Sequence, residues 1–199
     1  MLFIYLFDLL GTFTFAVSGA LLGVKKEMDI YGLFVLAFTA AVGGGTVREI
    51  ALGSIPPFLF TDPNYLYATV AAVMLVIFFN KKVERHMRYF TVMDAVGLGV
   101  FTVIGASKAI NAGLSWFAAL PVALLTCTGG GMLRDIFSGE IPIVLRKEVY
   151  ASASLTGALL FLLLRGLDVP DSVNAFFSAA AVVGIRLLTL KKNFHLPKV

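Results

Sequence analysis

The chain carries the same charged, glycine-rich pattern twice, and the two copies lie 86 residues apart. Residues 8–20 correspond to residues 94–106, and residues 43–56 correspond to residues 129–142 with eight of fourteen positions identical. Each copy contains a carboxylate, a glycine triplet and an arginine, all within apolar stretches where charge is costly. A duplicated apolar unit that is interrupted by glycine and carries charge is typical of transport proteins.

The composition indicates a membrane protein. Hydrophobic residues make up 59% of the chain, charged residues only 14%, and the mean hydropathy is +0.91. Soluble domains are about 45–50% apolar and about 25% charged. The net charge of +4 does not indicate nucleic-acid binding, because the basic residues lie at the ends of apolar segments, as they do beside membrane spans.

Seven apolar segments are long enough to be predicted as membrane-spanning helices, because a helix needs about 20 residues to cross the hydrocarbon. Backbone polar groups in lipid must be satisfied within the segment, so an all-α membrane protein is predicted. The predicted spans are residues 3–24, 30–53, 65–80, 91–110, 115–138, 147–165 and 172–190.

The spans divide the chain into three parts: a first three-helix repeat with a basic connecting loop (1–90), a second repeat (91–166), and a seventh helix with a basic tail (167–199). Because each repeat holds an odd number of spans, the second copy enters the membrane from the opposite face. The predicted architecture is therefore an inverted three-plus-three repeat with one appended helix.

Basic residues collect on one side of the predicted topology, which is expected to face the cytoplasm. The N-terminus is then outside and the C-terminus is cytoplasmic. Only Lys108 and Arg165 lie on the other side, and the cytoplasmic side holds Lys25, Lys26, Lys81, Lys82, Arg85, Arg88, Arg146, Lys147, Lys191, Lys192 and Lys198.

The glycine triplets lie in the second and fifth spans. Glycine costs about 1 kcal/mol relative to alanine inside a helix, so three in a row favour a kink or an unwound turn. An unwound turn at membrane depth must line water or face protein, and two such turns would create a polar route near the midplane. The alternative is close helix packing through small residues. The six glycines are Gly43, Gly44, Gly45, Gly129, Gly130 and Gly131.

Each triplet is followed one helical turn later by an arginine, Arg48 or Arg134, and then directly by a carboxylate, Glu49 or Asp135. Adjacent helix positions point about 100° apart, so these neighbours need not pair with each other. The first span of each repeat offers other partners for the arginines, Asp8 and Asp94.

These six charged residues are candidates for a pore or gate. The alternative is structural: ion pairs that lock the bundle, or side chains that extend to the membrane interface. Asp8 and Asp94 lie near span ends, where both interpretations remain open. Lys108 and Arg186 also lie near span ends and are expected to reach toward the interface.

Hydroxyl groups near these helices are weaker candidates for a pore lining, since a hydroxyl can bond the preceding turn of its own helix. They belong to Ser18, Thr46 and Thr128. The chain offers no catalytic constellation, so no enzyme activity is expected. No cofactor or metal is expected either, because His86, His195 and the single Cys127 lack metal-ligand spacing.

Taken together, the repeated Gly-Gly-Gly-x-x-Arg-Asp/Glu motif, the opening Asp-x-x-Gly-x-Phe-x-Phe-Ala-x-Ser-Gly-Ala and the Pro-Pro after the second span are specific. They resemble the prokaryotic members of the trimeric intracellular cation (TRIC) channel family, whose bacterial sequences also carry a glycine-transporter-like label. The resemblance covers residues 8–191.

The resemblance implies a seven-helix protomer in a homotrimer, with one pore per protomer that passes monovalent cations, mainly potassium and also sodium. It implies that the pore follows the kinked second and fifth helices, so both glycine triplets inherit the kink role, and that Arg48, Arg134 and Asp135 lie near the pore. It also implies a bacterial inner-membrane location with membrane lipids as neighbours, and lipid binding is left open.

Two functions therefore remain in competition. A cation channel is favoured by the resemblance, and the carboxylates could offset the arginines beside the ion route. A secondary transporter of glycine or another small zwitterion is the alternative, since exposed amides and an arginine suit a carboxylate. A structural membrane protein would leave the repeated arginine and glycine motifs without a purpose.

Overall fold

The computed structural model describes residues 2–79, 86–146 and 149–192, and within these ranges it contains helices and no strand. The all-helical class predicted from the sequence is therefore confirmed. The longer helices are α1 (Leu2–Lys25), α2 (Ile30–Ala51), α4 (Asn64–Phe79), α5 (His86–Asn111), α6 (Trp116–Phe137), α8 (Val149–Gly166) and α9 (Asp171–Lys191). Two four-residue helices, α3 (Phe58–Thr61) and α7 (Ile143–Arg146), were not predicted.

Each of the seven predicted spans coincides with one of the longer helices. Six of them are long and apolar enough to cross a membrane, and α4 is the exception. With 16 residues, α4 is about 24 Å long at 1.5 Å per residue, which is short of a hydrocarbon core of about 30 Å. The chain is thus a multi-pass membrane protein, and a full seventh crossing by α4 stays a prediction.

Local signals at the helix ends recur in both repeats. The side chain of Asp29 accepts a hydrogen bond from the backbone N–H of Gly32 at the start of α2, and Ser115 does the same for Ala118 at the start of α6. Gly53 and Gly139 follow α2 and α6 with φ of 73° and 72°, a left-handed conformation that glycine adopts without strain. Equivalent residues therefore start and stop the two glycine-rich helices.

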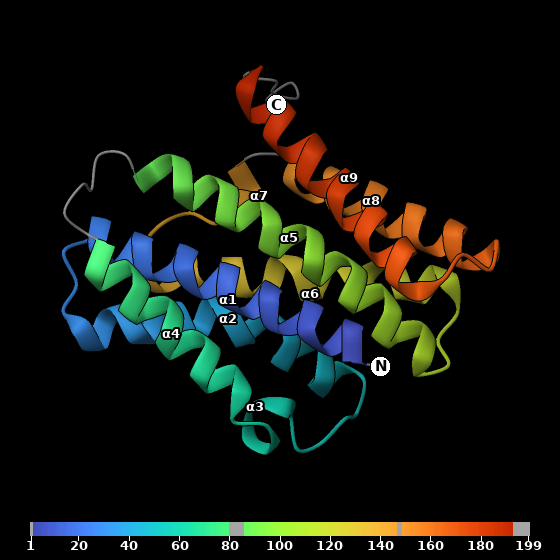
Figure 1. The fold of residues 1–199 in the computed structure, drawn as a ribbon, viewed down its shortest axis with the longest axis horizontal. Helices are drawn as coiled ribbons and strands as arrows, with labels where there is room; N and C mark the ends of the chain where they lie inside the picture. Colours follow the sequence, from blue (N-terminus) through green and yellow to red (C-terminus); the bar gives the residue numbers. More distant parts are fainter. Residues whose placement is uncertain (1, 80–85, 147–148, 193–199) are drawn as a thin grey trace.

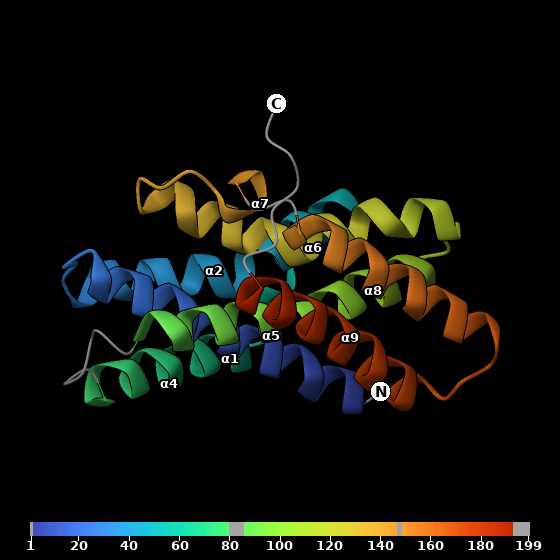
Figure 2. The same ribbon diagram turned by 90° about the horizontal axis from the view of Figure 1, so that it is seen from above.

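The helices of the two repeats pack in matching pairs. In the first repeat α1 contacts α2 and α4, and in the second α5 contacts α6 and α8. The repeats join through α1 against α5 and α2 against α6, and α9 packs on α5 and α8. Figures 1 and 2 show α1 and α5 crossing the centre in opposite directions, as expected for inverted copies. The predicted boundaries between the three parts stay a prediction.

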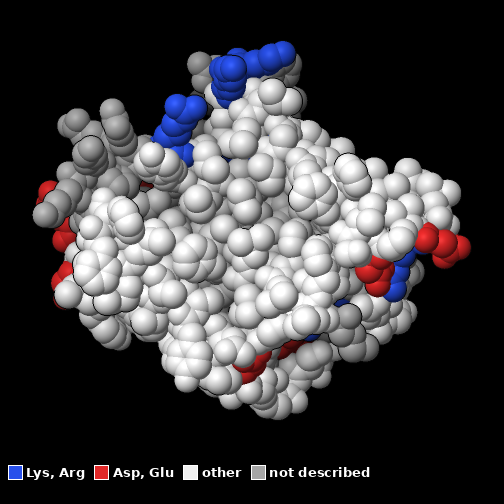
Figure 3. Space-filling model, in the orientation of Figure 1, with Lys and Arg blue, Asp and Glu red and all other residues white. Residues whose placement is uncertain are grey.

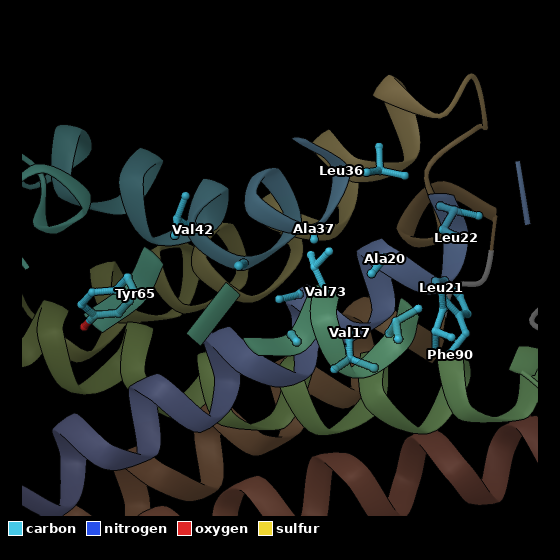
Figure 4. Close-up of a cluster of buried hydrophobic side chains, with 14 residues drawn as sticks. Val17, Ala20, Leu21, Leu22, Leu36, Ala37, Val42, Tyr65, Val73 and Phe90 are labelled. Atoms are coloured by element: carbon cyan, nitrogen blue, oxygen red, sulfur yellow. The ribbon is translucent and has the colours of Figure 1, made fainter. Parts of the chain in front are cut away.

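An apolar core follows α1 along its length. Figure 4 shows one cluster in which Val17, Ala20 and Leu21 of α1 face Ala37 of α2 and Val73 of α4. Small residues lie where helices approach most closely, as is common in membrane proteins: a methyl group on Gly19 of α1 would overlap the backbone of Leu36 and Ala37 in α2. The core therefore fixes the first repeat around α1, and the charged residues of that repeat lie toward the helix ends.

The surface is consistent with a lipid environment. The face in Figure 3 is almost entirely uncharged, and the Lys, Arg, Asp and Glu side chains gather at its margins. Many large apolar side chains are exposed, such as Phe78, Phe79 and Phe176. Exposed apolar surface of this extent marks a membrane or protein interface.

Candidate functional site

The two glycine triplets meet where α2 crosses α6. A methyl group added to Gly44 would overlap the carbonyl oxygen of Thr126, and one added to Gly130 would overlap the carbonyl oxygen of Ala40. A methyl group on Gly129 would press against Gly44 itself. The triplets therefore permit direct contact between two helix backbones at the centre of the protein.

The unwound turns that the sequence favoured are not present. α2 is helical without interruption from Ile30 to Ala51, and α6 from Trp116 to Phe137, so both triplets lie inside continuous helix. Close packing, the alternative interpretation, accounts for Gly43, Gly44, Gly129 and Gly130, because a methyl group on each would meet the facing helix. A methyl group on Gly45 would instead meet Phe58 of α3, and one on Gly131 would lie at ordinary contact distance from the Tyr150 hydroxyl. A kink that keeps the helical hydrogen bonds stays a prediction.

Beyond the crossing, Arg134 organises a buried cluster in the second repeat. Its side chain is 0% exposed. Nη1 lies 2.7 Å from Asp94 Oδ1 and donates to Ser18 Oγ at 2.9 Å, and Nε lies 2.9 Å from Asp135 Oδ1. The guanidinium also lies over the ring of Phe90, 4.8 Å from its centroid. One arginine thus holds two carboxylates and joins α6 to α5 and α1.

Asp135 has a second role, because it fixes the short helix that follows α6. Its Oδ2 accepts a hydrogen bond from the backbone N–H of Ile143, the first residue of α7, at 2.9 Å. In the first repeat Glu49 does the same for α3, since its Oε2 accepts from the backbone N–H of Phe58 at 2.6 Å. The carboxylate after each arginine therefore anchors the loop that follows its helix.

The matching cluster in the first repeat has different ion pairs. Arg48, only 1% exposed, lies 3.3 Å from Glu49 Oε1, and Lys108 reaches the same oxygen at 3.8 Å. Asp8 is not ion-paired with any described residue, and its Oδ2 accepts a hydrogen bond from the Tyr65 hydroxyl at 3.0 Å. Lys108 is thus half exposed but paired, and the repeated sequence supports two different networks.

Asp8 and Asp94 are not interfacial side chains. They are 5% and 2% exposed, so the interpretation that they extend to the membrane surface is wrong. The same correction applies to Arg186, which is 4% exposed and lies over the Tyr150 ring at 4.7 Å. Sequence reasoning also missed Tyr65 and Tyr150, because a tyrosine in an apolar span gives no signal of its partner.

The candidate hydroxyl groups divide into two kinds. Ser18 accepts a hydrogen bond from Arg134 and so belongs to the buried cluster. Thr46 and Thr128 donate to the carbonyl oxygens of Val42 and Leu124, four residues earlier in their own helices. That is the local bonding expected for threonine in a helix, and these contacts assign neither threonine a ligand.

A cavity of about 210 Å³ opens beside the second-repeat cluster. Asp94 and Asp135 line it, together with Arg186 from α9. Lys25 and Arg146 lie on its wall toward the basic end of the molecule. The cavity therefore gives the buried carboxylates of the second repeat a polar approach from the side that holds most of the lysines and arginines.

Chains of known structure resemble this protein over nearly its full length. The crystal structure of a TRIC orthologue from Rhodobacter sphaeroides has a TM-score of 0.91 and 36% identity, covering 96% of this chain and 98% of the other. A prokaryotic TRIC channel crystallised in 0.5 M KCl has a TM-score of 0.90 and 33% identity, covering 97% and 98%. The protein belongs to the TRIC channel family.

Sequence comparisons place other bacterial membrane proteins in the same family. The family model described as "Glycine transporter" matches residues 5–81 and 91–166. The UPF0126 inner membrane protein YadS of Escherichia coli K12 is 37% identical over 196 residues. The alignment covers 98% of this TRIC-family chain and 95% of YadS. Membership in this family also confirms that the protein is a membrane protein of a non-enzymatic class.

An exposed ion pair between Lys26 and Glu140 links the two repeats beside the cavity, which Glu140 lines. Lys26 Nζ lies 2.6 Å from Glu140 Oε1, and Arg146 lies 3.7 Å from Oε2. The hydrogen bond and the positive charge of Lys26 hold the pKa of Glu140 below its ordinary value. When folding lowers the pKa of a carboxyl group, the charged group stabilises the folded state at neutral pH. This contribution is lost as the pH falls through the lowered pKa.

Glu140→Gln is therefore expected to lower the unfolding midpoint only slightly at pH 7. Because the three side chains are partly exposed, the difference from wild type should vanish in high salt and at acidic pH. Thermal unfolding in detergent at two salt concentrations and two pH values measures this. A large difference that persists in 1 M salt, where the Debye length is about 3 Å, would contradict the assignment.

Proposed function

We propose that this protein is a monovalent-cation channel that passes potassium and sodium, with one pore in each protomer of a homotrimer. The observation that carries the proposal is the match over nearly the whole chain, at 33–36% identity, to solved TRIC channels, one of which is described as trimeric. Exposed apolar side chains along α4, α8 and α9 provide surface for lipid and for neighbouring protomers.

The charged clusters support a route for ions within the protomer. Buried ionisable residues in a membrane bundle are costly, and they usually mark ion pathways. Asp94 and Asp135 line the cavity at the basic end, and the Arg48 cluster lies beyond the glycine crossing. The arginines beside a cation route would weaken ion binding and allow release, or act as a gate.

We further propose that the protein lies in the inner membrane of a bacterium, with its N-terminus outside and its C-terminus in the cytoplasm. The support is the excess of lysine and arginine at one end and the inner-membrane name of the Escherichia coli relative. In this orientation the Arg134 cluster faces the cytoplasm and the Arg48 cluster faces outward.

A transporter of glycine is the second candidate, because the matching family model is described in those words. The inverted repeat of this protein also suits the alternating-access mechanism of transporters. However, the continuous helices at both triplets leave no unwound backbone amides there to bind a carboxylate, which was the main physical argument for it.

Purified protein in liposomes separates the two functions. A channel should release trapped potassium down its gradient at a rate that does not saturate with glycine, and it should not accumulate labelled glycine. Empty liposomes are the control. Saturable glycine uptake without potassium release would contradict the channel proposal and support the transporter.

A further inference from the structure

The two repeats carry charged residues of the same sign at corresponding positions but pair them differently. Asp8, Arg48 and Glu49 correspond to Asp94, Arg134 and Asp135. In the second repeat the aspartate on the first helix is paired with the arginine at 2.7 Å. In the first repeat this pair is absent among the described ion pairs, and the Asp8 carboxylate is left with the Tyr65 hydroxyl. The charged positions correspond one to one, but Glu49 is one methylene longer than Asp135, and Tyr65 has no counterpart at the corresponding position 151. The second repeat thus shows an arginine–aspartate pairing that the first repeat does not form.

Asp8 is a buried carboxylate that forms no ion pair with a lysine or arginine of the described residues. It is only 5% exposed, and buried charges in proteins are normally paired or coordinated to a metal ion. Oδ2 accepts the Tyr65 hydrogen bond, and Oδ1 accepts none from a residue of the described ranges. Among the charges that act on Asp8, those of Arg48 and Lys108 attract the carboxylate and that of Glu49 repels it.

Arg48 is a buried cation with unused donors. Its guanidinium meets Glu49 at 3.3 Å and lies 5.9 Å from the centroid of the Phe58 ring. Its Nε and Nη1 have no hydrogen-bond partner in the described structure. Because an unsatisfied buried donor is costly, these two nitrogens would gain a partner if Arg48 turned toward Asp8, as Arg134 is turned toward Asp94.

On the basis of the proposed channel function, we propose that the Asp8 carboxylate binds a permeating monovalent cation and that Arg48 is its tethered competitor. The carboxylate and the phenol oxygen of Tyr65 offer the hard oxygen ligands that potassium and sodium prefer. When Arg48 pairs with Asp8, it displaces the ion and the first repeat takes the arrangement seen in the second. Asp94, the corresponding aspartate of the second repeat, is already paired with Arg134. Asp8 and Asp94 are therefore not equivalent as binding sites for an ion.

Cation binding can be measured on the purified trimer without any conductance. Thermal unfolding is followed in increasing potassium chloride and, as the reference, in N-methyl-D-glucamine chloride of equal ionic strength. A bound ion raises the midpoint by mass action, so wild type should be more stable in potassium. Asp8→Asn should lose this potassium-specific increment, and the matched variant Asp94→Asn should keep it even though its own ion pair is broken.

Arg48→Gln tests the competitor independently of Asp8. The apparent dissociation constant equals the intrinsic value divided by the fraction of molecules in which the site is free. Removing the guanidinium should therefore shift the potassium dependence to lower concentrations. If Asp8→Asn does not fold, an unchanged potassium dependence in Arg48→Gln overturns the proposal.

Equal unfolding midpoints of wild type in the two salts, or a full potassium increment in Asp8→Asn, would also overturn the proposed cation site.

A planar-bilayer recording then separates this inference from the channel function on which it rests. Wild-type current together with an unchanged conductance–concentration curve in Asp8→Asn contradicts the Asp8 site alone. Absence of wild-type current, with the potassium increment still present, contradicts the channel and leaves Asp8 as a cation site.

Discussion

Arg134→Met is expected to lower the free energy of unfolding by about 3–5 kcal/mol, since removing one partner of a buried ion pair leaves an uncompensated charge. The loss affects both Asp94 and Asp135, which this one guanidinium holds at 2.7 and 2.8 Å. Methionine keeps much of the side-chain volume, so the effect reports charge and hydrogen bonding more than packing. Unfolding in detergent, followed by circular dichroism, measures it.

The control for this prediction is Arg165→Met, which removes a partly exposed arginine near the end of α8 that donates to the side chain of Asn111. We expect a change within about 0.5 kcal/mol, as is usual for surface substitutions. Combining Arg134→Met with Asp94→Asn should recover part of the loss, because one of the stranded charges is then removed. An Arg134→Met protein as stable as the Arg165→Met control would contradict the assignment of the buried cluster.

Gly44→Ala and Gly130→Ala are each expected to cost about 1–3 kcal/mol, the usual penalty for overpacking a core. In both, the added methyl group meets a backbone carbonyl of the facing helix, and a backbone cannot move aside as a side chain can. The double variant should be worse still, because the two contacts lie at one crossing. The measurement is the same unfolding experiment.

Gly184→Ala gives this prediction an internal control with the opposite sign. Gly184 lies inside α9, and a methyl group there meets no atom within 4 Å. Since alanine is favoured over glycine in a helix by about 1 kcal/mol, this substitution should stabilise the protein. Stabilisation by alanine at all three glycines would show that α2 and α6 do not cross as closely as the structure indicates.

The long helices were predictable because their apolar runs have the length of a membrane span. The short helices were not, since four residues carry no periodicity and α3 and α7 depend on contacts with Glu49 and Asp135. A carboxylate next to an arginine in the sequence gives no sign that it also binds a loop backbone. The sequence therefore predicted the long helices well, but it did not predict the short helices or the contacts that hold them.

The glycine triplets show where local reasoning fails. Helix propensity alone favours unwinding at three successive glycines, because each costs about 1 kcal/mol. That cost is offset by contact between α2 and α6, which lie 86 residues apart in sequence and whose approach no local pattern reports. Tertiary packing thus reverses the preference that the isolated segment would have.

The charged residues of the site were identified from the sequence, but their pairing was not. Asp8 and Asp94 were both candidate partners for the arginines, and only Asp94 forms such a pair. The charged positions of the two motifs differ only by Glu49 in place of Asp135, and that difference does not indicate which aspartate pairs with its arginine. Asp8 instead accepts a hydrogen bond from Tyr65, and the corresponding position 151 of the second repeat is an alanine.

The central claim is that each protomer conducts cations along the inverted repeats. The most direct test is the reversal potential of purified protein in a planar bilayer with a tenfold potassium chloride gradient. A cation channel should reverse near the potassium equilibrium potential, of magnitude about 59 mV for one charge. A reversal potential near zero, or one of the sign set by chloride, would contradict the account.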